Sequence, residues 1–148
     1  MTNLELDPVE QKALLDEVTD LVQRSAPQDW SRLAVEYKAI GRHVQVGAGA
    51  KNSAGELVQW APPEEVWNLL WRLRVGMHRP RLGTWFSPFY RLNPPADFEI
   101  VYNRDNPPQW HDEPPLRAYT DEQAMFPRDE PNLPAWFADK LRAAEKAS

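Results

Sequence analysis

Residues 83–103 decide the fold, and they read GTWFSPFYRLNPPADFEIVYN. The first half of this stretch is rich in aromatic side chains and has a preference for extended backbone. Residues 93–97 form a cluster of turn-forming types, after which apolar side chains recur at every second position, as Phe98, Ile100 and Tyr102. Two extended runs on either side of a proline-rich turn are typical of a β-hairpin. The stretch therefore predicts an α+β fold with an antiparallel sheet.

Periodic patterns on both sides of the hairpin predict the other elements. Asp7-Pro8-Val9-Glu10 has the cap, the proline and the glutamate that begin a helix, and an apolar stripe follows it at helical spacing. Residues 30–46 and 56–60 alternate as strands do, which predicts a three-stranded meander. The remaining predicted elements are a helix from 61–65 to 76–80, the hairpin, and short helices at about 115–125 and 134–144.

These elements predict one architecture for the chain. The order is α-β-β-β-α-β-β-α-α, with an antiparallel sheet of about five strands and helices packed on one face. We expect Gly47-Ala48-Gly49-Ala50 to be a flexible or bulged strand end, because small residues specify a strand weakly. We expect Tyr119, Phe126, Trp136 and Phe137 to hold the proline-rich C-terminal part against the body of the domain.

Composition limits the class of protein. A length of 148 residues predicts a single domain covering 1–148, and zero cysteine excludes disulfides and thiolate zinc sites. No apolar run approaches the length of a membrane span, and the acidic N-terminal segment lacks the pattern of a signal peptide. A net charge of −5 disfavours a nucleic-acid partner. We therefore expect a cytoplasmic protein that acts without membrane or nucleic acid.

Acidic residues gather in the C-terminal third of the chain. Residues 97–130 contain nine acids against three arginines, whereas residues 72–91 contain five arginines and no acid. Two interpretations are open. The acids form ordinary solvated faces, or they form an acidic surface that attracts a basic partner and sets its specificity.

The chain shows no established catalytic motif. None of its three histidines has metal-ligand spacing to another, no G-x-S-x-G is present, and residues 47–53 lack the spacing of a phosphate loop. One alternative remains at His111, which Asp112 or Glu113 can orient for acid–base chemistry. We expect no enzyme activity, no metal and no cofactor.

Seven tryptophans are a high number for this length, and they allow two interpretations. They pack in and around the core, or some of them form an aromatic binding platform. The platform candidates are Trp67, Trp71, Trp85 and Trp110. Trp110 is the best candidate for a binding role because it lies in a polar, proline-rich segment.

Several of these motifs together resemble the YezG-like family of bacterial immunity (antitoxin) proteins. The resemblance covers roughly residues 10–145 and rests on Asp29-Trp30, on the 83–103 hairpin, and on three later features. Those features are Tyr119, Phe126-Pro127-Arg128-Asp129 and Leu133-Pro134-Ala135-Trp136, which look like an actinobacterial branch found beside TNT-type NAD-glycohydrolase toxins. One departure is the middle helix, where acidic residues and tyrosines of the family are replaced by Arg72, Arg74, Arg79 and Arg81.

The resemblance implies a non-catalytic, cytoplasmic protein that neutralises a toxin by stoichiometric binding. We expect the acidic segment 104–130 to meet a basic cleft of that toxin. The predicted partner-binding residues are Trp110, Asp112, Glu113, Tyr119, Asp121, Glu122 and Phe126. Two alternatives stay open: an accessory domain of a toxin or secreted-effector system, and a small enzyme that uses His111.

Overall fold

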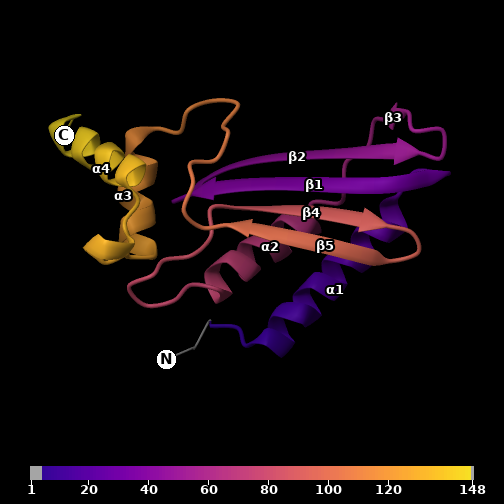
Figure 1. Ribbon diagram of the computed structural model, residues 1–148, viewed down its shortest axis with the longest axis horizontal. Coiled ribbons are helices and arrows are strands. Elements are labelled where there is room, and N and C mark those ends of the chain that lie inside the picture. Colours follow the sequence, from indigo (N-terminus) through magenta and orange to yellow (C-terminus); the bar gives the residue numbers. More distant parts are fainter. Residues whose placement is uncertain (1–4, 148) are drawn as a thin grey trace.

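The computed structural model describes residues 5–147 and contains the elements in the predicted order (Figure 1). The expected α+β class is confirmed, with four α-helices and a five-stranded antiparallel sheet. The elements are α1 (Pro8–Ser25), β1 (Trp30–Ile40), β2 (His43–Asn52), β3 (Leu57–Val58), α2 (Glu65–Gly76), β4 (Ser87–Asn93), β5 (Asp97–Asn103), α3 (Leu116–Met125), a 3-10 turn (Glu130–Asn132) and α4 (Ala135–Ala147).

The sheet has the strand order β3-β2-β1-β4-β5, with the long strand β1 at its centre. Leu33 of β1 shows how the register is set, because it lies opposite Ala50 of β2 on one side and Leu92 of β4 on the other. All three side chains are buried. A shift of one residue would turn each of these apolar side chains to the opposite face, so burial specifies the pairing.

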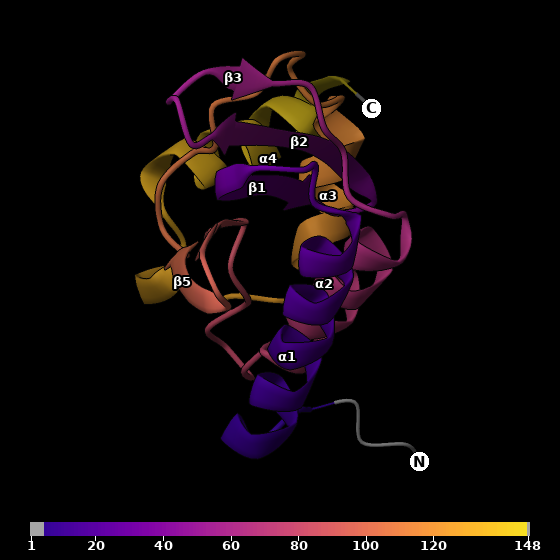
Figure 2. The same cartoon turned by 90° about the vertical axis from the view of Figure 1, so that its right-hand side faces the viewer.

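Helices α1 and α2 lie next to each other against one face of the sheet (Figures 1 and 2). Asp7 caps α1 in the predicted capping box, with the Glu10 backbone N–H donating to Asp7 Oδ1 at 2.8 Å. The apolar stripe of α1 is buried together with that of α2 and the inward face of β1. Burying a valine or leucine side chain stabilises the fold by about 1.5–3 kcal/mol, so each member of this layer contributes to stability.

Helices α3 and α4 pack against each other at the end of the sheet where β1 ends (Figure 1). They enclose a second apolar cluster that includes Ile40, Phe86 and Phe137. Tyr119 belongs to the same cluster, Trp136 packs against it, and Phe126 is buried in contact with His78, so the prediction that aromatic side chains hold the C-terminal part in place is confirmed. The helices thus divide into a pair on one face and a pair across the end of the sheet.

The prediction for Gly47–Ala50 is wrong. These residues pair regularly with Leu33–Glu36 of β1, and the irregularity in this ladder lies between Trp30 and Arg32 instead. Neither Gly47 nor Gly49 has a positive φ. The long, buried strand β1 fixes the backbone of its neighbour, and this tertiary pairing overrides the weak local preference of glycine.

Candidate functional site

Three of the predicted partner-binding residues are buried and cannot contact a partner at the surface of this structure. Tyr119, Glu122 and Phe126 all belong to or follow α3 and lie in the interior. The side-chain hydroxyl of Tyr119 donates to Glu113 Oε1 at 2.8 Å. Their expected role in partner binding is corrected accordingly: they join α3 to the rest of the domain.

Glu122 belongs to a buried polar network at the junction of α2 and α3. Its carboxylate forms an ion pair with Arg74 and accepts the backbone N–H of Gly41 at 2.7 Å. The Arg74 guanidinium also donates to the carbonyl oxygens of Trp85 at 3.1 Å and Ala39 at 3.3 Å. A charge in this position is stable only because it is paired and hydrogen-bonded, so the network serves the architecture.

The loop that carries Trp110 is docked on the sheet through Gln45. The His111 backbone N–H donates to Gln45 Oε1 at 2.8 Å, and Gln45 Nε2 donates to the carbonyl oxygen of Asp112 at 2.6 Å. The half-buried Trp110 ring packs edge-to-face on His43, with 5.6 Å between the ring centroids. His111 itself is exposed. Such a position does not supply the concave pocket that the acid–base alternative requires.

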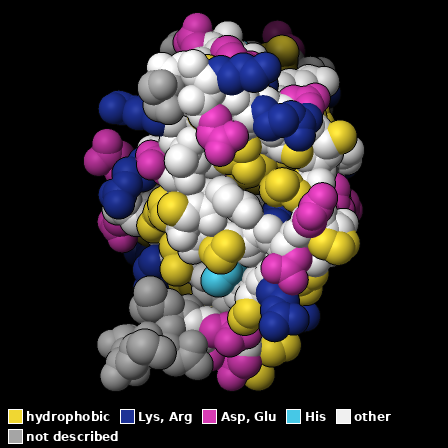
Figure 3. All heavy atoms as spheres, turned by 90° about the vertical axis from the view of Figure 1, so that its left-hand side faces the viewer, with side chains coloured by type: hydrophobic (Ala, Val, Ile, Leu, Met, Phe, Trp, Pro, Cys, Tyr) yellow, Lys and Arg dark blue, Asp and Glu magenta, His cyan; other side chains and the backbone are white. Residues whose placement is uncertain are grey.

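Basic side chains interrupt the predicted acidic surface. Lys140 Nζ lies 2.9 Å from Glu113 Oε1, and its hydrogen bond holds the pKa of that carboxyl below its usual range. Asp121 lines a hollow together with Arg42 and Arg117. Asp112 is exposed. Figure 3 shows the α3–α4 end of the molecule, where acidic and basic side chains alternate with hydrophobic ones rather than forming one acidic face.

The outer edge of β2 stands out as a different candidate. Strand β3 pairs only with Ala50 and Lys51, so within the described part of the chain residues 43–49 have a strand neighbour on one side alone. In an antiparallel ladder every second residue directs its N–H and C=O away from its neighbour. These outward groups form a free hydrogen-bonding edge.

Apart from the loop docked on Gln45, this edge lacks the usual protection against another strand. Natural proteins block exposed edges with charged residues, proline or bulges. The segment His43-Val44-Gln45-Val46-Gly47-Ala48-Gly49 contains no Lys, Arg, Asp, Glu or Pro, and its pairing with β1 is regular. Val44 and Val46 are 38% and 42% exposed. Strand β5 at the opposite edge differs, because it carries Asp97 and Glu99.

An aromatic groove adjoins the free edge on the helix side of the sheet. It has a volume of about 360 Å³ and lies between α2 and β2, lined by Tyr37, Arg42, Val44, Trp67, Asn68 and Trp71. Trp67 is half-buried and stacks on Tyr37 with 6.4 Å between the ring centroids. We call the outward edge of residues 43–49 together with this groove the β2 edge site.

The four tryptophans of the predicted platform do not lie together. Trp67 and Trp71 share the groove, whereas Trp85 is buried between Tyr37 and Tyr102. Trp110 packs on His43 in the loop before α3. Sequence reasoning missed Val44 and Val46 as site residues, although their alternation was visible. Nothing in the pattern shows that β3 is too short to cover them.

Comparison of the chain with models of protein families gave no match. Comparison with curated proteins gave no match either. The resemblance to YezG-like immunity proteins therefore rests on the short motifs given above and stays a prediction.

Residues 5–147 contain neither a cluster of metal-ligand residues nor a helix suited to spanning a membrane. Within that range no group of three or more His, Cys, Asp or Glu residues is arranged to hold a metal ion. None of the helices in the same range has the length and apolar content needed to cross a membrane.

Proposed function

We propose that this chain is a non-catalytic protein-binding domain that neutralises a bacterial toxin by stoichiometric binding. The observation that carries the binding role is that residues 43–49 have a strand neighbour on one side alone and lie beside an aromatic groove. The toxin as partner class follows from the resemblance to immunity proteins. Occlusion of a toxin requires affinity and shape, and it needs no reacting group on the inhibitor.

In the proposed complex an extended segment of the partner adds to the sheet along β2. Backbone hydrogen bonds to a free edge supply affinity, and pockets for alternate side chains supply specificity. The groove at Trp67 and Trp71 is positioned for that second role, because it lies on the same face of β2 as Val44. Half-buried tryptophans are well suited as anchors, since they add apolar contact without ordering a flexible side chain.

The charge of the chain supports a basic partner. A net charge of −5 attracts a cationic protein over a distance of about one Debye length and speeds the encounter. The edge itself is uncharged, so this attraction steers the approach while the strand contacts hold the complex. We expect the association rate, more than the dissociation rate, to fall as the salt concentration rises.

A pair of matched variants tests the site. Val46→Lys places a charge at the free edge, whereas Val101→Lys places the same charge on β5, where Val101 is 69% exposed. The partner captured by the tagged wild-type chain would be purified and titrated against both variants. We expect Val46→Lys to weaken binding at least about tenfold, or roughly 1.4 kcal/mol, and Val101→Lys to leave it unchanged. Equal affinities for the two variants would contradict the proposal.

A growth assay tests the toxin role separately. The captured partner would be expressed in a bacterial host with and without this chain. We expect the partner alone to stop growth, the wild-type chain to restore it, and Val46→Lys to restore it less well than Val101→Lys. A partner that is harmless on its own would leave the binding site intact but remove the immunity role.

A further inference from the structure

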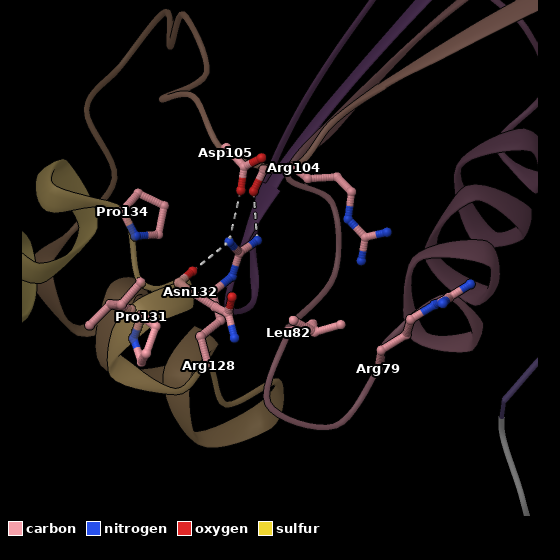
Figure 4. A pocket seen from close by; sticks show the side chains of 9 residues that line it. Arg79, Leu82, Arg104, Asp105, Arg128, Pro131, Asn132 and Pro134 are labelled. Atoms are coloured by element: carbon pink, nitrogen blue, oxygen red, sulfur yellow. Dashed lines mark hydrogen bonds and ion pairs between the residues drawn. The ribbon is translucent and has the colours of Figure 1, made fainter.

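A second cavity shares no lining residue with the β2 edge site and lies where the loops after α2 and β5 meet the segment before α4. It has a volume of about 490 Å³, within the usual range for small-ligand sites. Three segments enclose it: the loop after α2, the start of the loop after β5, and the segment around the 3-10 turn (Figure 4). Its lining residues are Arg79, Leu82, Arg104, Asp105, Arg128, Pro131, Asn132, Leu133 and Pro134.

Arg128 is a fixed positive charge in the wall of this cavity. It is almost entirely buried, and its guanidinium donates to the carbonyl oxygens of Arg104 at 2.6 Å, Thr84 at 2.9 Å and Asn132 at 3.2 Å. The central carbon of the guanidinium also lies 4.8 Å from the centroid of the Phe86 ring, in a cation–π contact. The only carboxylate of the lining, Asp105, lies 3.4 Å from Arg128 Nη1 and is 80% exposed, so it compensates a single charge.

The other two arginines of the lining, Arg79 and Arg104, have no ion pair within the described residues. Arg79 is exposed and Arg104 is half-buried. They come from different segments, and in Figure 4 both side chains lie on the other side of Leu82 from Pro131 and Pro134, with that of Arg79 extending away from Arg128. The lining thus contains three arginines and one aspartate in a chain whose net charge is −5.

We propose that this cavity binds a small organic anion, consisting of a carboxylate or phosphate group on an apolar body. The fork of N–H donors on arginine matches these planar or tetrahedral oxyanions and holds them by charge-assisted hydrogen bonds. Arg104 supplies those donors together with Arg79, whose exposed side chain is free to turn towards the cavity, and Arg128 supplies a fixed positive charge in the wall. Leu82, Leu133 and Pro134 form the apolar wall that receives the body of the ligand.

Isothermal titration calorimetry with four probes tests the proposal. The probes are phenyl phosphate, benzoate, inorganic phosphate and the uncharged benzyl alcohol. We expect phenyl phosphate or benzoate to bind at millimolar or lower concentration, and at least about tenfold more tightly than benzyl alcohol. The tighter of the two identifies the head group. Absence of binding by both aromatic anions, or equal binding of benzyl alcohol, would overturn the proposal, as would inorganic phosphate binding more tightly than phenyl phosphate.

Amino-acid substitutions then test whether the anion binds in this cavity. Arg79→Gln combined with Arg104→Gln should reduce the affinity at least about tenfold, because both charged donors are removed. Arg72→Gln is the matched control, since it removes a surface arginine of α2 that does not line the cavity. Val46→Lys must leave anion binding unchanged, which separates this site from the β2 edge site. An unchanged affinity in the double variant, with an unchanged melting temperature, would refute the assignment.

Discussion

Arg74 and Glu122 form a buried ion pair that ties α2 to α3, with 0% and 3% of their side chains exposed. The two residues belong to different apolar layers, the sheet-and-helix core and the C-terminal helical pair. Their contact therefore couples the folding of the last third of the chain to the folding of the sheet.

Removal of one member of this pair should destabilise the domain strongly. We expect Glu122→Gln to lower the free energy of unfolding by about 3–5 kcal/mol, because Arg74 is then left as an uncompensated buried charge. Arg74→Met combined with Glu122→Met should be less destabilising than the sum of the two single variants. Urea denaturation measures all three. Asp16→Asn, which breaks the exposed pair with Lys12, is the control and should change stability by less than about 1 kcal/mol.

The side chain of His78 should make stability depend on mildly acidic pH. Burial lowers the pKa of His78 below the ordinary 6.5, although the carboxylates of Glu5 and Glu122 act in the opposite direction. Its ring contacts Phe126 at 5.2 Å between centroids. The folded state thus favours the neutral imidazole of His78. The stability that depends on this neutral form is present above pH 6.5 and is lost as the pH falls from there through the folded-state pKa.

Urea midpoints at a series of pH values between about 4 and 8 would measure this effect, since the window spans the ordinary histidine pKa. We expect His78→Gln to flatten the dependence in the acidic half of the range. His111→Gln, which changes an exposed ring, should leave it as in the wild type. Parallel curves for the wild type and His78→Gln would show that other groups carry the pH dependence.

The four tyrosine side chains should ionise at a higher pH than free tyrosine, because all are at least partly buried. Burial raises the pKa of Tyr37, Tyr90 and Tyr102 to about 12, and it raises that of Tyr119 further. At pH 11 the folded protein should show little tyrosinate absorbance at about 295 nm, whereas the chain in urea should show most of it. Since the folded-state values are raised, stability is complete below about pH 10 and falls as the pH rises towards 12.

Two tryptophan substitutions decide between the two binding surfaces. Trp67→Ala truncates an aromatic side chain of the β2 edge site. Trp110→Ala truncates the aromatic side chain that the sequence predicts as a binding residue in the acidic segment 104–130. We expect Trp67→Ala to weaken partner binding by about 2 kcal/mol or more and Trp110→Ala to have a smaller effect. Calorimetric titration of the captured partner measures both. A larger loss of affinity in Trp110→Ala than in Trp67→Ala would show that the partner binds at the loop before α3 instead.

Local patterning was enough to predict most of the fold. The capping box at Asp7, the alternation of Phe98, Ile100 and Tyr102 and the proline-rich turn between the hairpin strands each specify an element through nearest neighbours in sequence. Because antiparallel strands and amphipathic helices must each bury one face, those elements also predict the α+β class and the order of the chain.

The tertiary structure alone decided which surfaces are available. The sequence by itself marks Glu122 as an acid, Phe126 as an aromatic anchor and Gly47 as a strand end. Packing buries the side chains of the first two in the interior and pairs the third with Glu36. Exposure depends on neighbours that are distant in the chain, such as Arg74 for Glu122. The short β3 leaves the β2 edge open for the same reason, because the length of contact between two strands is a property of the assembled sheet.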